Sequence, residues 1–297
     1  MQTLDLSRPR DGYADLSEVR LHYVEAGEGP LVVLLHGFPE FWLSWRFQIP
    51  ALAASGFRVV APDMRGYNLS SRPAGVAAYD LDRLAADVRD LIHERGARSA
   101  FVAGHDWGGF VAWRTAMSHP TEVARLAILN MPHPRRLLHA LRRPRQLARS
   151  WYVFFFQLPW IPERVVRGGR WRPLRYGFEH DARPGAFTPL DIARYVEAWS
   201  RTGASTAMLN YYRAAFRRSP RAAEQQIGVV SAPTLVICGE RDRYLGAELA
   251  EPDPADVPNL KRVARLPNAS HWVHHDEPER VNRLLIEFFT ETFSVAL

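Results

Sequence analysis

A glycine-framed turn between an apolar run and a helical pattern is the feature that most constrains this chain. The apolar run covers residues 99–103, the turn reads Gly104-His105-Asp106-Trp107-Gly108, and residues 110–118 resemble a helix in composition. Glycine tolerates strained backbone and close approach of a second backbone, because it has no side chain to clash. The sequence therefore predicts a strand, a tight turn that carries Asp106, and a helix.

The chemistry of this turn depends on its central residue. The spacing is that of the nucleophile elbow, which normally reads Gly-x-Ser-x-Gly, with aspartate in the serine position. A free aspartate titrates at ~4, so its carboxylate is a nucleophile at neutral pH without help from a base. Its attack on a substrate carbon makes an alkyl ester rather than an acyl-enzyme. Asp106 thus points away from esterases and towards enzymes that open epoxides or displace halides, unless it only caps the following helix.

Short apolar runs alternate with helical patterns along most of the chain. We expect strands at residues 19–25, 31–35, 57–61, 101–103, 126–129, 234–238 and 262–266. We expect helices at residues 41–54, 81–95 and 278–293. This alternation predicts an α/β fold with a mostly parallel sheet covered on both faces.

One long segment departs from this alternation. Residues 134–226 are rich in arginine and aromatic residues, contain several prolines, and hold no convincing buried strand. We interpret them as a helical cap, or lid, inserted into a core made of residues 1–133 and 227–297. Such an insertion lies over the strand ends, where open α/β sheets bind ligands.

Composition limits the class of protein. The formal net charge is +6, and much of the excess is arginine in residues 135–183. A basic surface could bind nucleic acid, but no nucleic-acid module is visible, and arginine stems packed on aromatic rings explain the pattern. The single cysteine, Cys238, permits no internal disulfide, residues 1–18 lack an apolar signal region, and no apolar run approaches the ~20 residues of a membrane span. We expect a cytoplasmic protein with no membrane span and no nucleic-acid partner.

Two further residues complete a catalytic pattern with Asp106. Asp242 follows the predicted strand at 234–238, and His271 follows the last predicted strand. The order nucleophile, acid, histidine along the chain resembles that of α/β-hydrolase triads, and each residue lies just beyond a strand end. In this interpretation His271 deprotonates a water, and Asp242 orients and stabilises its imidazole. The competing candidates are Glu240 for the acid, and His274 and His275 for the base.

Taken together, these motifs resemble those of epoxide hydrolases of the α/β-hydrolase fold. The resemblance covers residues 19–293. It rests on His36-Gly37-Phe38-Pro39, on residues 63–70 (Asp-Met-Arg-Gly-Tyr-Asn-Leu-Ser), on the turn at Asp106, and on the surroundings of Asp242 and His271. It implies hydrolysis of an epoxide to a vicinal diol through a covalent ester on Asp106.

The resemblance also assigns groups around the reacting atoms. The backbone N–H groups of Phe38 and Trp107 would form the oxyanion hole. Two cap tyrosines would donate to the epoxide oxygen, and their sequence contexts match Tyr152 and Tyr212, with Tyr211 as the neighbouring alternative. A phenol with a pKa of ~10 is a neutral donor at pH 7. The side chains expected to line the substrate site are aromatic: Phe38, Trp107, Trp151 and Phe155.

The implied partner is a small apolar epoxide, handled by a monomer or homodimer. No cofactor and no metal is implied, because the sequence has no Cys/His cluster with ligand spacing and no glycine-rich phosphate loop.

Two alternatives remain at this stage. A haloalkane dehalogenase would use the same triad and could bind halide with the Trp107 indole, although those enzymes often have asparagine or a similar polar residue where Phe38 stands. A fluoroacetate-type dehalogenase would carry arginine in place of Trp107. A ligand-binding protein without catalysis on the same scaffold is the second alternative.

Overall fold

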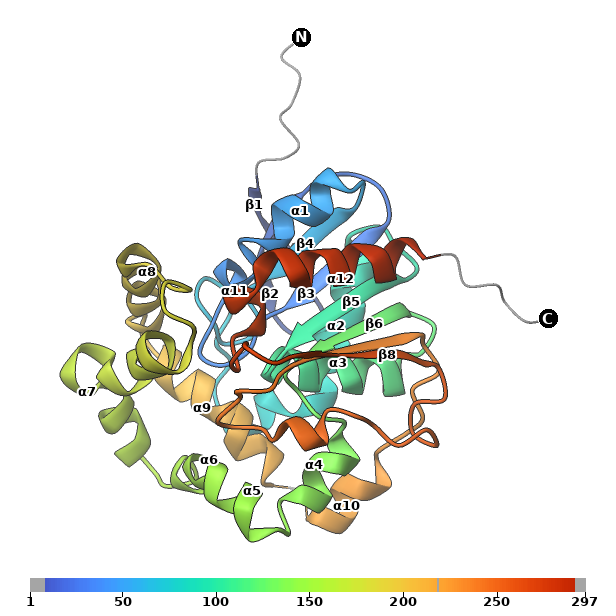
Figure 1. Ribbon diagram of the computed structural model, residues 1–297. Helices are drawn as coiled ribbons and strands as arrows, with labels where there is room; N and C mark the ends of the chain where they lie inside the picture. Colours follow the sequence, from blue (N-terminus) through green and yellow to red (C-terminus); the bar gives the residue numbers. More distant parts are fainter. Residues whose placement is uncertain (1–8, 218, 292–297) are drawn as a thin grey trace.

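An eight-stranded sheet runs through the centre of the molecule in the computed structural model, which describes residues 9–217 and 219–291 (Figure 1). The strands are β1 (Arg10–Asp15), β2 (Arg20–Ala26), β3 (Leu31–Leu35), β4 (Arg58–Pro62), β5 (Ala100–His105), β6 (Val123–Leu129), β7 (Thr234–Gly239) and β8 (Leu260–Leu266). Their order across the sheet is β1-β2-β4-β3-β5-β6-β7-β8. Only the pairings of β2 with β1 and β4 are antiparallel, and the other neighbours are parallel. The predicted α/β class with a mostly parallel sheet is confirmed.

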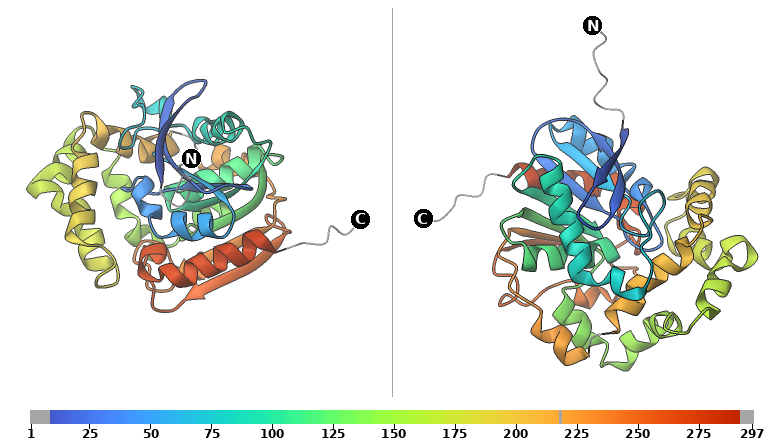
Figure 2. Two further views of the ribbon diagram at one scale, coloured as in Figure 1. Left: turned by 90° about the horizontal axis from the view of Figure 1, so that it is seen from above. Right: turned by 180° about the vertical axis from the view of Figure 1, so that it is seen from behind.

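Helices cover both faces of this sheet, as Figure 2 shows. Alternate residues of a strand point to opposite faces. In β3, Val33 and Leu35 pack in a cluster with residues of α2 (Leu81–Glu94) and α3 (Trp107–Ser118). Val32 and Leu34 pack in a second cluster, with residues of α1 (Gln48–Ala54) and α12 (Pro278–Thr290). A strand buried on both faces has no polar side, which is why β3 reads as a continuous apolar run.

The helix predicted for residues 41–54 is wrong as a single element. The structure has a short 3₁₀ helix, η1 (Trp42–Trp45), followed by α1. Pro50 lies in the first turn of α1, and a proline ring clashes with the carbonyl four residues earlier in a continuous helix. The chain therefore breaks near Arg46 and starts a new helix.

The N-terminal edge strand was not predicted. In β1 only Ala14 is buried, so the strand lacks the apolar alternation that marks β2, and its pairing with β2 defines it. The predicted C-terminal helix is α12, and its predicted last residue, Phe293, lies outside the described residues.

Helices occupy the stretch between β6 and β7, and we call α4 to α10 the cap helices. They are α4 (Pro134–Ala140), α5 (Pro144–Arg149), α6 (Trp151–Phe155), α7 (Ile161–Tyr176), α8 (Pro189–Trp199), α9 (Ala204–Ala215) and α10 (Pro220–Gln225), with a π-helix, η3 (Gly177–Asp181), after α7. They lie along one side of the sheet, past the carboxyl ends of the strands (Figure 1). The remaining short helices are η2 (Val76–Tyr79), η4 (Ala247–Leu249) and α11 (Val273–Asp276). Among the described residues, no helix combines the length and apolar character needed to cross a membrane.

Candidate active site

Asp106 lies in a strained turn between β5 and α3. Its backbone angles are φ 49° and ψ −120°, which non-glycine residues rarely adopt. The turn brings backbones so close that a Cβ at Gly104 would meet the carbonyl of Gly108, and one at Gly108 would meet the carbonyl of Leu35. The two glycines are therefore required sterically, as the sequence pattern predicts.

The Asp106 side chain faces away from the helix that it precedes. It makes no capping hydrogen bond to α3. Instead its Oδ1 accepts the backbone N–H of Phe38 at 2.8 Å, from the loop after β3. The Phe38–Pro39 peptide bond in this loop is cis. A Cβ at Gly37 would lie 2.5 Å from the Asp106 Cβ, so this loop position also needs glycine.

His271 links Asp106 to the second carboxylate. Its Nε2 lies 3.5 Å from Oδ2 of Asp106, and its Nδ1 lies 2.8 Å from Oδ2 of Asp242. His271 follows β8 and Asp242 follows β7, so the carboxyl ends of parallel strands bring the three side chains to one edge of the sheet. The three residues are all buried.

Other groups fix the orientation of the Asp242 carboxylate. Its Oδ1 accepts the backbone N–H groups of Tyr244 and Leu245 at 2.7 and 2.9 Å. Its Oδ2 accepts Nδ2 of Asn130 at 2.8 Å, besides Nδ1 of His271. The sequence reasoning missed Asn130, although it directly follows β6 and therefore carries the same strand-end signal as the triad.

The two carboxylates control the charge of His271. Burial alone would lower the pKa of His271, but Asp242 and Asp106 raise it to about 10. Burial alone would raise the pKa of Asp242, but the His271 charge and the hydrogen bonds to its carboxylate keep that pKa below its usual value. An imidazolium between two carboxylates is therefore the favoured state at neutral pH.

Tyr152 on α6 and Tyr212 on α9 face the same carboxylate from the cap helices. Their ring centroids are 6.0 Å apart. Burial, together with the nearby Asp106 charge, raises the pKa of both phenols, so both are neutral donors. The hydroxyl of Tyr211 instead donates to the carbonyl of Arg65 at 2.7 Å, which favours Tyr212 as the residue at the site.

Two cavities meet at these residues. One of about 210 Å³ and another of about 400 Å³ are both lined by Asp106, Tyr152 and Tyr212. The smaller cavity is walled by Trp107 and, farther out, by apolar side chains that include Phe110 and Leu137. The other side chains expected to contact substrate line the larger cavity: Phe38, Trp151 and Phe155.

The competing acid and bases lie elsewhere. Glu240 is exposed at the end of β7. The ring of His275 reaches Glu40, with Nε2 3.1 Å from Oε1, and Nε2 of His274 lies 2.7 Å from the Ser44 hydroxyl. Tyr244, which the sequence reasoning also missed, lines the larger cavity with its ring 5.1 Å from that of His271.

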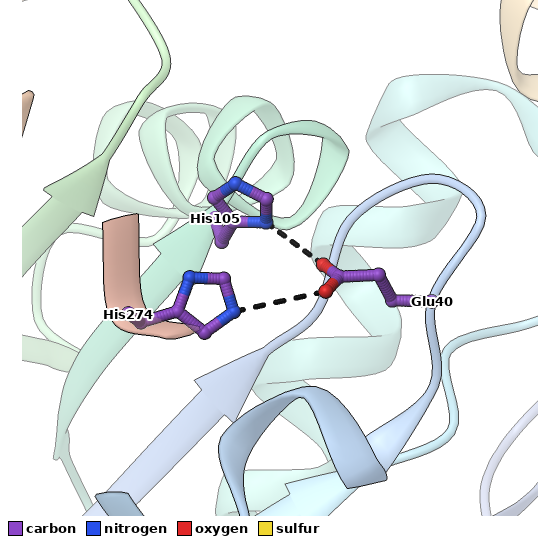
Figure 3. A group of neighbouring side chains, drawn as sticks. All are labelled: Glu40, His105 and His274. Atoms are coloured by element: carbon purple, nitrogen blue, oxygen red, sulfur yellow. Dashed lines mark hydrogen bonds and ion pairs between the residues drawn. The ribbon is translucent and has the colours of Figure 1, made fainter. Parts of the chain in front are cut away.

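A buried cluster behind the triad joins three segments of the core (Figure 3). The carboxylate of Glu40 accepts Nδ1 of His105 at 2.8 Å and lies 3.7 Å from Nε2 of His274. Nε2 of His105 donates to the carbonyl of His271 at 2.9 Å, so both ring nitrogens of His105 face acceptors. Burial alone would raise the pKa of Glu40, but His105 and the hydrogen bonds hold it well below its usual value. His105, which directly precedes Asp106 in the chain, thereby joins Glu40 to the backbone of His271.

These three residues also have the donor types of a metal site, and one ligand atom from each falls within 4.8 Å of the others. Most of the possible ligand atoms are already in hydrogen bonds: both Glu40 oxygens and both His105 nitrogens are paired, and Nε2 of His274 pairs with the Ser44 hydroxyl, while Nδ1 of His274 has no partner among the described residues. We therefore interpret the cluster as a charged hydrogen-bond network.

The sequence is similar to those of known α/β hydrolases. Residues 30–278 match the family described as the alpha/beta hydrolase fold. The chain is 41% identical over 283 residues to the AB hydrolase superfamily protein YfhM of Bacillus subtilis, covering 93% of this chain and 96% of that protein. It is 39% identical over 283 residues to epoxide hydrolase 4 of Homo sapiens, covering 93% and 77% respectively.

Solved structures give the same result. The crystal structure of Bacillus megaterium epoxide hydrolase in complex with an inhibitor superposes with a TM-score of 0.86 at 32% identity, covering 94% of this chain and 100% of that one.

Proposed function

The chain belongs to the epoxide hydrolases of the α/β-hydrolase fold, and on that basis we propose that it converts an epoxide to a vicinal diol through an alkyl ester on Asp106. Asp106 is the nucleophile, His271 the base, Asp242 its orienting acid, and Tyr152 and Tyr212 the donors to the epoxide oxygen. The observation that carries this proposal is the meeting of two cavities at a carboxylate faced by two neutral phenols.

In the first step an Asp106 oxygen bonds to a ring carbon and the ring C–O bond breaks. The oxygen that leaves carries developing negative charge, and an alkoxide departs poorly unless it is strongly hydrogen-bonded or protonated. The hydroxyls of Tyr152 and Tyr212 supply those hydrogen bonds. The Phe38 N–H already holds Oδ1 of Asp106, and with the Trp107 N–H it would form the oxyanion hole for the ester carbonyl.

In the second step water attacks the ester carbonyl. Alkylation removes the Asp106 charge, which is one of the groups that raise the His271 pKa, so His271 becomes easier to deprotonate. The proton that His271 then loses balances the one that the ring-opened oxygen takes up. Neutral His271 accepts a proton from the attacking water, and the bond between the Asp106 carboxyl carbon and the alkoxy oxygen breaks. That alkoxy oxygen takes up the other proton of the water, so the diol leaves with an oxygen that came from Asp106 and the carboxylate is regenerated.

We further propose the domain division predicted from the sequence, with residues 134–226 as a cap on a core of residues 1–133 and 227–297. The cap then supplies both phenols, and the core supplies the nucleophile, the base and the acid. The predicted substrate is small and apolar, which agrees with the apolar side chains around both cavities.

A single turnover in heavy-oxygen water tests this mechanism. With enzyme in excess over styrene oxide, we expect the first diol to carry no solvent oxygen and a peptide containing Asp106 to gain it. Many turnovers in the same water are the control, since they must give labelled diol. Solvent label in the first diol, with none in the Asp106 peptide, would mean direct attack by water and would overturn the proposal.

The same cavities bear on the dehalogenase alternative. Tyr152 and Tyr212 line both cavities together with Asp106, and their neutral hydroxyls are donors that a departing halide does not need. These two donors support the epoxide reaction over halide displacement.

A further inference from the structure

The outer rim of the cap helices exposes large apolar side chains. Six of them fall within residues 147–161, on α5, on α6, in the connection between α6 and α7, and at the start of α7. We call them the rim patch: Leu147, Trp151, Phe154, Leu158, Trp160 and Ile161. Trp160 is 77% exposed and Trp151 is 64% exposed. The three helices follow one another along the edge of the cap in Figure 1. Exposed apolar clusters on this scale are typical of surfaces that bind something.

The backbone at Trp160 adds to this observation. Its φ of 59° is in the left-handed region, which bulky side chains rarely adopt. The residue caps α7 with no side-chain hydrogen bond. Neither the strained backbone nor the exposed indole of Trp160 stabilises the folded protein. Binding of the indole to another molecule accounts for this conformation better.

The same segment carries a strong positive charge. Residues 134–176 contain eleven arginines, no lysine and a single acidic residue, Glu163. The Glu163 carboxylate is already taken by Arg213, at 2.6 Å. Arg143, Arg145 and Arg164 are exposed, and none forms an ion pair with any residue in the ranges 9–217 and 219–291. The rim patch therefore lies in a region that attracts a negatively charged surface.

The rim patch is also continuous with the larger cavity. Trp151 lines this cavity together with Arg149 and Val165, and the same cavity reaches Asp106 and His271. Since Trp151 is mostly exposed, the cavity opens at the rim patch.

We propose that the rim patch docks on the surface of a bilayer that contains anionic phospholipid. Tryptophan and phenylalanine favour the membrane–water interface, and arginines beside them bind lipid phosphates. A second copy of the chain is disfavoured, because a two-fold contact would bring two such positive segments together. Nucleic acid would match the charge but not the exposed Leu158, Trp160 and Ile161. The docked orientation puts the cavity mouth on the bilayer, from which an apolar epoxide enters; this last step alone rests on the proposed function.

Vesicle flotation of the full chain tests the docking without any measurement of activity. The probes are vesicles of phosphatidylcholine mixed with phosphatidylglycerol, and vesicles of pure phosphatidylcholine. We expect binding to the mixed vesicles that weakens with added salt, and far weaker binding to the neutral ones. Each arginine near an anionic surface is worth about fivefold in binding, so Arg143→Gln/Arg145→Gln should bind about 30-fold more weakly. Trp160→Ser/Ile161→Ser should lose at least about tenfold.

One matched control variant tests for a general effect of charge, and two measurements on all variants test for misfolding. Arg98→Gln/Arg283→Gln removes the same charge from exposed core positions and should bind like the wild type. All variants should keep the wild-type melting temperature and the wild-type rate on a water-soluble epoxide. Equal binding of the rim and control variants, binding to neutral vesicles alone, or tight binding to a DNA duplex with none to mixed vesicles would each overturn the proposal.

Discussion

The rings of Tyr152 and Tyr212 stand nearly perpendicular, at 79°, with centroids 6.0 Å apart, although 60 positions separate them in the chain. Neighbouring aromatic side chains pack against both rings. Phe156 packs against both, at 5.7 Å from Tyr152 and 5.0 Å from Tyr212, and Trp107 lies 5.0 Å from Tyr212. The two hydroxyls are therefore fixed by packing before any substrate binds.

We predict that Tyr152→Phe and Tyr212→Phe each slow ring opening by about 100-fold, because the loss of one oxyanion-type donor costs on the order of 3 kcal/mol. The double variant should be nearly inactive on epoxides. Stopped-flow measurement of the alkylation rate checks this. Tyr176→Phe, at an exposed position on α7, is the matched control and should react like the wild type. If the double variant keeps most of its activity and haloalkanes yield halide, the dehalogenase alternative gains support.

We predict that His271→Gln still becomes alkylated but releases product very slowly. Asp106 needs no base for its attack, whereas hydrolysis of the ester does. Intact-protein mass spectrometry should show an adduct of substrate mass. Asp106→Asn should form no adduct under the same conditions. Normal steady-state turnover by His271→Gln would remove this residue from the mechanism.

The raised pKa of His271 predicts how stability depends on pH. The folded value of about 10 exceeds the ordinary 6.5, so charged His271 stabilises the fold fully below pH 6.5 and this contribution is lost as pH rises to about 10. Asp106→Asn removes one carboxylate that raises this pKa. His271 contributes part of the difference in unfolding free energy between the wild type and Asp106→Asn. That part should therefore shrink as the pH rises from 6.5 to about 10.

Urea unfolding at several pH values, with NMR titration of the His271 ring, measures both quantities. The titration midpoint should be lower in Asp106→Asn than in the wild type. An unchanged midpoint would show that Asp106 does not influence His271.

We predict that Glu40→Ala lowers the free energy of unfolding by about 3–5 kcal/mol, because it leaves the buried side chains of His105, Ser44 and His275 without the carboxylate to which they hydrogen-bond. Denaturant unfolding monitored by fluorescence measures this change. Glu28→Ala, at an exposed loop position, is the control and should change stability little. A loss of less than about 1 kcal/mol for Glu40→Ala would contradict the charged network that we infer.

The sequence predicts best what depends on local pattern. The central strands are buried on both faces, so their apolar runs stand out, and the three residues that we propose as a triad could be selected because each follows a strand. β1 is not readable, because Ala14 is its only buried residue. Tyr211 and Tyr212 are adjacent on one helix and about 100° apart around its axis, so only packing separates their roles. Asn130 follows β6 and Asp242 follows the neighbouring β7, so the position of Asn130 at a strand end is visible in the sequence, but its hydrogen bond to Asp242 is seen only in the structure.

The cap helices leave the sheet after β6 and return to it at β7, two strands that are neighbours. The residues that would cleave the ester, Asp106, Asp242 and His271, lie outside the cap helices, and both phenols that would assist ring opening lie within them. Substitutions in the cap helices can therefore alter which epoxide is opened, and at which carbon, without changing the residues that would hydrolyse the ester. In such a chain, substrate selectivity and the rate of ester hydrolysis can change independently during evolution.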